Sequence, residues 1–419
     1  MSDRHRDHDI EQSLASWMGD AAPDRAPTRL LEDTFVQTMK TQQARVYPWD
    51  RIRVGAARSM AAGSQGRIAL VLTGALLVVV VANAITGGGV PVPTALPSPS
   101  PSASAPAPTR TPPPTLPPST SIATEASVPV PGSIAMVSDG VSLYVLAGGR
   151  IDRIDPATNA VTGTVSIGLS SDLYNGLAVN AAGLWATDST AALVTRVDLG
   201  TLAVAARISA GSAPKGVLAT DAGVWVADVH GGAVLRIDPA SNTTTASVTV
   251  GPTGNSGPNW LASGLGSIWV GVPNNGSIGR FDPATAAIQA TIAVPPGFSP
   301  CGGIAVGSDA AWITACAGAG TMARIDPASN TSTITLPLPG FAYNPTLIDG
   351  APWVSVDNGN ERSGMLVRIN PATNRVDRVL LPPAPFGGGG DIVLAAGSVW
   401  VVDGWNNVVL RLPLSAFGA

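Results

Sequence analysis

Hydrophobic and polar residues alternate in short runs along the C-terminal two thirds of the chain. In the stretch from Gly216 to Gly251, apolar runs at 217–219, 224–227, 234–237 and 246–250 are separated by turn residues. Short apolar, β-branched runs bounded by Gly, Pro, Asn or Asp are typical of β-strands. The pattern therefore predicts a unit of four strands.

This four-strand unit recurs seven times. Each copy has an aromatic residue on its second strand and an arginine on its third. The aromatics are Tyr144, Trp185, Trp225, Trp269, Trp312, Trp353 and Trp400, and the arginines are Arg153, Arg196, Arg236, Arg280, Arg324, Arg368 and Arg411. Successive arginines are 43, 40, 44, 44, 44 and 43 residues apart. A period of about 40–45 residues with four strands per repeat is the signature of propeller blades. The sequence thus predicts an all-β fold, a seven-bladed β-propeller over residues 126–419.

The two ends of this region do not match the internal repeats. The chain stops after the third strand of the last unit, and a lone short strand at 127–130 precedes the first unit. Pro129 has no N–H to donate to a ladder, which suits an edge strand. We expect this early strand to complete the last blade and to close the ring.

The repeated residues are interpreted as structural. Asp-Pro or Asn-Pro between the third and fourth strands is type I turn chemistry; it occurs at 155, 238, 282, 326 and 370. The second-strand aromatics are expected to pack between adjacent blades, and the arginines to reach an Asp or a carbonyl at a blade rim.

A predicted membrane span precedes the repeats. Residues 68–85 carry no charge, and eleven of these 18 residues are Ile, Leu or Val. About 17–25 apolar residues cross a bilayer, so we expect a transmembrane helix at 67–86. Arginines precede the span and the next charge after it is Arg110, which predicts a cytoplasmic N-terminus and an extracytoplasmic propeller at the cell membrane. Cleavage after Ala84, as in a signal peptide, is the competing interpretation.

The segments that flank the span differ in composition. Residues 1–66 are densely charged and predict at most two short amphipathic helices, which are either a cytosolic stub or a docking segment for a cytosolic partner. Residues 87–125 predict an extended linker, with 12 Pro between Pro91 and Pro118.

The loops that lead into the inner strands, and those between second and third strands, are expected to gather around the mouth of the channel. The candidate binding residues there are Tyr174, Asn175, Lys215, Asn259, Trp260, Tyr343, Asn344, Asp357, Asp391 and Trp405. Asp188, Asn274, Asn360 and Asp403 lie in the same loops. Within these loops, Asp228 and His230 are the only neighbouring acid and imidazole, and hence weak catalytic candidates. The net charge of −4 implies no nucleic-acid partner. No metal site or cofactor is predicted.

The chain has two cysteines, Cys301 and Cys316. They flank a predicted hairpin on the extracytoplasmic side, where disulfides persist. We expect them to form a disulfide.

The motif Val-Trp-Val-Ala-Asp at 224–228, with Val-Leu-Arg-Ile-Asp-Pro at 234–239 and Pro-Lys-Gly at 214–216, resembles the seven-bladed virginiamycin B lyase-like and surface-layer YVTN propellers. The resemblance covers about 126–419. It implies the propeller fold and, in the lyase, a metal-assisted elimination that uses acidic and His residues at the channel mouth. Here Lys215, Cys301, Asn344 or Gly stand at most matching positions. The overall layout is similar to that of membrane anti-sigma factors, although residues 1–66 contain no Cys for their usual zinc motif.

These observations favour a membrane-anchored, extracytoplasmic propeller that binds or senses an unknown ligand or protein. The alternative is a metal-dependent lyase or hydrolase that uses Asp228 and His230.

Overall fold

The computed structural model describes residues 116–169, 175–315, 320–342 and 344–418. Residues 1–66, the predicted span and most of the predicted linker lie outside this part of the chain. Among the residues described, no helix has the length and apolar character needed to cross a bilayer.

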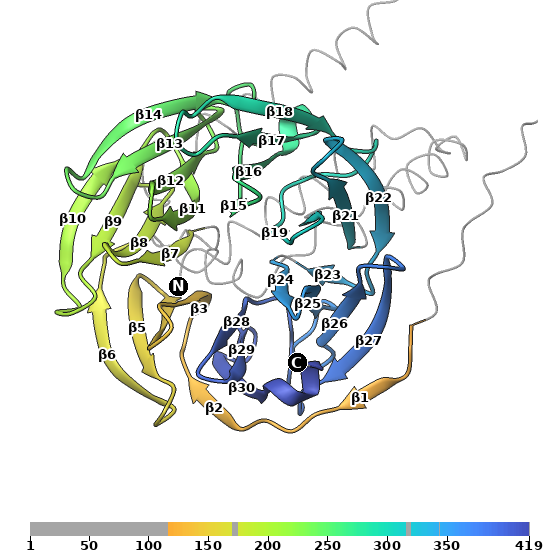
Figure 1. Ribbon diagram of the computed structural model, residues 1–419. Helices are drawn as coiled ribbons and strands as arrows, with labels where there is room; N and C mark the ends of the chain where they lie inside the picture. The colour runs from red at the N-terminus through yellow and green to blue at the C-terminus, as the bar shows by residue number, and fades with distance from the viewer. Residues whose placement is uncertain (1–115, 170–174, 316–319, 343, 419) are drawn as a thin grey trace, which may run out of the picture. The chain divides into compact units, whose positions relative to one another are not determined.

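Seven β-sheets stand around a central axis (Figure 1). Blade one contains β3 (Ser133–Ser138), β4 (Leu143–Ala147), β5 (Arg150–Asp155) and β6 (Ala160–Ser166). Blade two contains β7 (Leu177–Asn180), β8 (Gly183–Asp188), β9 (Leu193–Val197) and β10 (Val204–Ser209). Blade three contains β11 (Pro214–Thr220), β12 (Gly223–Asp228), β13 (Ala233–Asp238) and β14 (Thr243–Thr249). Blade four contains β15 (Leu261–Gly264), β16 (Ser267–Val272), β17 (Ser277–Phe281) and β18 (Ile288–Ala293).

The remaining blades continue the same order. Blade five contains β19 (Ile304–Val306), β20 (Ala311–Thr314), β21 (Thr321–Asp326) and β22 (Thr331–Pro337). Blade six contains β23 (Phe341–Ala342), β24 (Thr346–Ile348), β25 (Ala351–Asp357), β26 (Met365–Asn370) and β27 (Arg375–Leu381). Blade seven contains β28 (Ile392–Ala395), β29 (Ser398–Asp403) and β30 (Val408–Pro413), and the short 3-10 helix η2 (Leu414–Phe417) follows it. The predicted seven-bladed propeller is confirmed.

The ring is closed by the early strand, as the sequence predicts. Strand β2 (Ala126–Pro129) pairs antiparallel with β30 and becomes the outer strand of blade seven, with Val128 opposite Val409. Pro129 thus lies on an outer edge, where its missing N–H costs no ladder hydrogen bond.

The described part of the chain begins at residue 116, within the stretch 87–125 that the sequence predicts to be a linker. Strand β1 (Ser119–Ser121) pairs in parallel with the outer edge of β27. Leu116 packs against the interface of blades five and six, and Ile122 against that of blades six and seven. The repeat pattern holds no counterpart of this fifth strand, so the sequence did not predict it.

Blade six also departs from the regular repeat at its inner edge. Its inner strand is split into β23 and β24, both of which pair with β25. Pro345 lies in the break and supplies no backbone N–H, which interrupts the ladder at this point.

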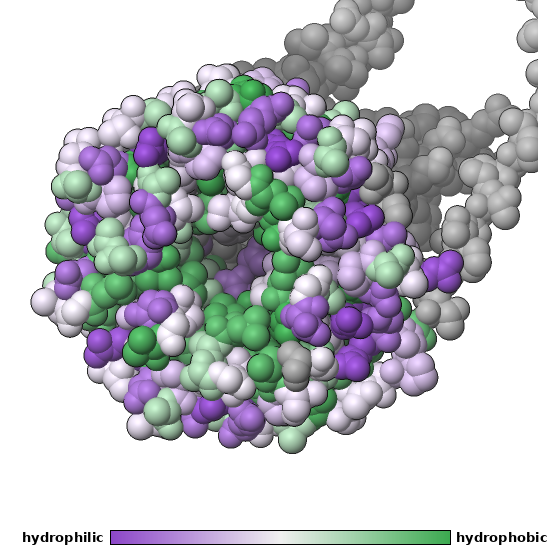
Figure 2. Space-filling model, viewed as in Figure 1, coloured by the Kyte–Doolittle hydropathy of each residue, from purple (hydrophilic) through white to green (hydrophobic). Residues whose placement is uncertain are grey.

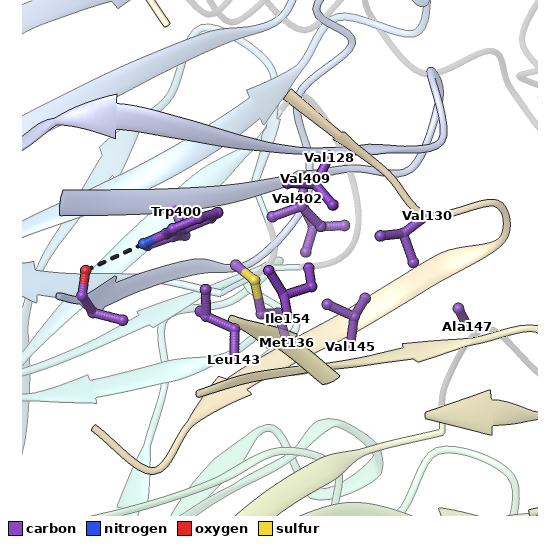
Figure 3. Packing of buried hydrophobic residues seen from close by; sticks show 11 residues of the cluster. Val128, Val130, Met136, Leu143, Val145, Ala147, Ile154, Trp400, Val402 and Val409 are labelled. Carbon is purple, nitrogen blue, oxygen red and sulfur yellow. Dashed lines mark hydrogen bonds between the residues drawn. The ribbon is translucent and has the colours of Figure 1, made fainter. Parts of the chain in front are cut away.

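The hydrophobic core is divided among the seven joints between blades. Each joint has one cluster of buried residues, and each cluster contains one second-strand aromatic. Trp185, for example, packs with Val224 and Val226 of the next blade, as predicted. All seven aromatics are at most 2% exposed. At the closing joint, Val128, Val409 and Trp400 face Met136, Leu143 and Ile154 of blade one (Figure 3).

The third-strand arginines lie opposite these aromatics. In five blades the guanidinium stands over the indole ring, 4.8–5.7 Å from its centroid. Three of them also reach the turn of the following blade, where Nη1 donates to a Pro carbonyl and to an Asn Oδ1. These are Arg196 with Pro239 and Asn242, Arg280 with Pro327 and Asn330, and Arg411 with Pro156 and Asn159.

The turn sequence of the next blade explains two of the exceptions. Arg153 and Arg236 face turns in which Leu202 and Ala286 replace the Asn at the positive-φ position. Arg236 keeps only the hydrogen bond to a carbonyl of its own blade, that of Ala222, which corresponds to the bond from Arg196 to Ala182. The predicted carbonyl and Asp partners of the arginines are thus confirmed, since Arg324 and Arg368 bond Asp309 and Asp377.

The Asp of each Asp-Pro turn caps its own turn. Asp155 Oδ1 accepts the backbone N–H of Ala157 at 2.8 Å, and Asp326 accepts that of Ala328 at 2.8 Å. These backbone hydrogen bonds lower the pKa of both carboxyl groups. The turn role predicted for these residues is confirmed.

Candidate functional site

The candidate site is the mouth of the central channel, at the end of the ring where the loops enter the inner strands. Figure 2 shows one face of the ring with an opening at its centre and apolar residues gathered along part of its wall. The inner strands of neighbouring blades contact one another around this opening. Residues at the start of different inner strands therefore lie at the same height along the channel axis.

Four aspartates end the second strands of blades two, three, six and seven. They are Asp188, Asp228, Asp357 and Asp403, and all are 4% exposed or less. Each accepts backbone N–H groups of nearby loops. Asp228 Oδ1 takes those of Ser212, Ala213 and Gly231, at 2.9–3.1 Å. The four carboxylates therefore hold the mouth loops in place through hydrogen bonds and do not lie on an open surface.

Glycines make room for the carboxylate of Asp228. A Cβ on Gly211 or on Gly231 would lie 2.1 Å from Asp228 Oδ2, and Gly211 has a φ of +73°. Only glycine satisfies both conditions at Gly211. Asp228 and the glycines packed against it thus act together to anchor the loop.

Asp228 and His230 point to different surroundings. Asp228 is turned toward backbone amides, whereas His230 is exposed on the loop surface. Within the described part of the chain, no hydrogen bond joins the two side chains, and no group of three or more His, Cys, Asp or Glu is placed to hold a metal ion.

A hydrogen bond between Trp405 and Asp357 joins the loops of blades six and seven. The indole Nε1 of Trp405 donates to Asp357 Oδ2 at 3.1 Å. Gly387 lies against the ring, since a Cβ there would come within 2.5 Å of it. Asn406 links the loops further, because its Nδ2 donates to Asp403 and to the carbonyl of Glu361. Burial raises the pKa of Asp403.

The other candidates lie where the inner strands begin. Asn175 is buried and accepts the N–H of Ser189. Lys215 is half-buried, and its carbonyl accepts the hydroxyl of Thr187. Asn259 and Trp260 are half-buried at the entry of β15. Asn344 donates through Nδ2 to Asp391 Oδ1, which joins blade six to blade seven.

Three candidates lie outside the described residues: Tyr174, Tyr343 and Cys316. Cys301 is 5% exposed in the loop before β19. The pairing of Cys301 with Cys316 stays a prediction.

One polar network at the closing joint was missed by the sequence analysis. Glu125 Oε2 accepts a hydrogen bond from Ser398 at 2.7 Å and pairs with Arg411 Nε at 2.9 Å. Its signal in the sequence is a lone acid in a stretch interpreted as linker, which gives no hint of these partners.

Comparisons with known proteins agree with this architecture. No family model and no curated protein sequence matches the chain. Among solved structures, hydrazine synthase of Kuenenia stuttgartiensis is similar with a TM-score of 0.58 and 15% identity, over 69% of this chain and 97% of that one. The WD40 repeats of RRP9 give a TM-score of 0.57 and 12% identity, over 70% and 99%. The computationally designed Ika8 protein gives 0.50 and 11%, over 70% and 99%. At these identities the likeness shows the fold alone, which agrees with the β-propeller formed by the seven sheets of this chain.

Proposed function

We propose that the chain is a membrane-anchored, extracytoplasmic binding module that uses the mouth of its propeller to hold a ligand or a protein. The main support is the burial and hydrogen bonding of the carboxylates at the mouth. Four of them are buried, and their oxygens accept hydrogen bonds from loop amides or a Trp indole. Such groups fix the loops in place, and loops held on a rigid scaffold are typical binding surfaces.

The loops that enter the inner strands vary while the blades repeat. The loop between β14 and β15 covers residues 250–260, whereas the loop between β10 and β11 covers only 210–213. Variation confined to loops on a regular framework favours recognition as the role of this face.

Photo-crosslinking in intact cells tests the binding role. A photoreactive residue at Trp260 is expected to give specific adducts with a partner. The matched control is Val141, which is 77% exposed in the turn after β3, at the opposite end of the inner strands. Equal adducts at both positions, or none at Trp260, would contradict a binding role for the mouth.

The orientation in the membrane is tested separately. Protease added to spheroplasts is expected to remove residues 126–419 and to spare 1–66, followed with epitope tags at both ends. This result follows from the arginines before the predicted span at 68–85. Protection of the propeller would overturn the predicted topology.

Loss of the mouth imidazole distinguishes binding from the alternative lyase or hydrolase. His230→Ala is expected to leave the fold intact and to change ligand binding by less than about tenfold, the scale of one ordinary polar contact. A general base at this position would instead contribute about a hundredfold or more to turnover. A metal-dependent lyase or hydrolase activity of the purified chain that disappears with His230→Ala would overturn the binding proposal.

A further inference from the structure

The inner strands of the seven blades have one equivalent position at the channel mouth, two residues before the residue that pairs with the second-strand aromatic. The residues there are Ala135, Gly176, Gly216, Trp260, Gly303, Asn344 and Asp391. Blade seven alone has a charged residue at this position.

Both hydrogen bonds of the Asp391 carboxylate come from neutral donors. Oδ1 accepts from Asn344 Nδ2 of blade six, and Oδ2 accepts the backbone N–H of Met136 of blade one at 2.9 Å. None of the ion pairs among the described residues includes Asp391. An ionised carboxylate has about four acceptor sites, so two remain for another donor.

The negative charge is not needed for these contacts. An Asn at 391 could accept the Met136 N–H through its Oδ1 and donate to Asn344 after rotation of the Asn344 amide. Deep placement among protein atoms raises the pKa of Asp391, which means that folding disfavours its ionised form. Residue 391 as a whole is nevertheless only half-buried, and it lies where the inner strand of blade seven begins. The ionised Asp391 carboxylate is thus disfavoured by burial and has no cationic partner among the described residues. Such a carboxylate is a candidate for binding a cation from outside the chain.

One residue on blade four, across the ring from blade seven, has chemistry that suits the same kind of ligand. The half-buried Trp260 occupies the position equivalent to Asp391. A carboxylate and an aromatic ring both favour a positively charged group. Lys215, the cation at this level, lies on blade three and makes no ion pair with Asp391.

We propose that Asp391 is the anionic seat for an alkylammonium or guanidinium group that enters the channel mouth, while Trp260 on the opposite blade contacts the rest of the ligand. This inference rests on the proposed binding function and names the chemistry of its ligand. The group can belong to a free amine or to a Lys or Arg side chain of a peptide.

The test is calorimetric titration of the purified full-length chain with three probes. They are agmatine, a blocked Gly-Arg-Gly peptide and the same peptide with neutral citrulline in place of Arg. The citrulline peptide has the shape of the arginine peptide without its charge. At least one of the two cationic probes is expected to bind about tenfold or more tightly than this neutral peptide. Binding of agmatine identifies a free amine as sufficient, and binding of the peptide alone identifies a peptide ligand.

Asp391→Asn is expected to reduce this binding by about tenfold or more. Its thermal stability at pH 7 should equal or exceed that of the wild type, because the folded state no longer contains a carboxylate whose pKa is raised. The matched control is Asp221→Asn, an exposed acid in the turn after β11, which should bind as the wild type does. Trp260→Leu provides a second variant with a reduced affinity if Asp391→Asn fails to fold.

The proposal would be overturned if neither agmatine nor the arginine peptide bound more tightly than the citrulline peptide, or if Asp391→Asn left the binding unchanged. Adducts at Trp260 in the photo-crosslinking experiment would then still support the binding function. Absence of both results would remove both proposals.

Discussion

Replacing Val128 with aspartate is expected to lower the free energy of unfolding by at least about 3 kcal/mol. Val128 is 3% exposed and packs at the joint where blade seven meets blade one. A carboxylate there would have no cation beside it, so it must lose its hydration or expel β2 from the sheet. Chemical unfolding of the full-length chain measures the change.

Ser127→Asp is the matched control for this prediction. Ser127 is exposed, adjacent on β2, and should tolerate the same carboxylate within about 0.5 kcal/mol. Equal effects of the two substitutions would contradict the pairing of β2 with β30 and the closure of the ring by this strand.

Trp400→Ala is expected to cost about 3–5 kcal/mol, the usual range for removal of a large buried aromatic. The indole fills the closing joint and its Nε1 donates to the carbonyl of Ala395 at 3.2 Å (Figure 3). The same measurement applied to Trp→Phe exchanges separates packing from hydrogen bonding. Trp225, whose Nε1 has no acceptor among the described residues, should lose less stability on conversion to Phe than Trp400 does. A larger loss at Trp225 would contradict a stabilising role for the Trp400 hydrogen bond.

The fold could be predicted from the sequence because the same physical constraint acts seven times. Every joint between blades needs one large aromatic, and every turn needs an Asp or Asn to cap it. A single error of register would therefore have stood out against the six other copies. The closing role of β2 could be predicted for the same reason, since the last repeat visibly lacks a strand.

The pairing of β1 and the burial of the carboxylates at the mouth could not be predicted in this way. Ser119 pairs with Val379 only because the segment before β2 passes along the outer edge of blade six in the closed ring. No local sequence pattern encodes this path. The burial of Asp228 depends on Gly211 and Gly231, which precede and follow it in different loops. A sequence shows that a carboxylate lies in a loop, but its availability depends on the amides that the fold brings to it.

The closing strand has a consequence for the order in which the protein folds. Val128 precedes its partner Val409 by 281 residues. During synthesis, β2 leaves the ribosome before every blade and stays without its partner until β30 has been made. Pairs so distant in sequence form slowly, although the entropy of closing a long loop rises only gradually with its length. Each of blades one to six can therefore assemble as its own strands emerge, whereas the joint between blades seven and one is the last to form.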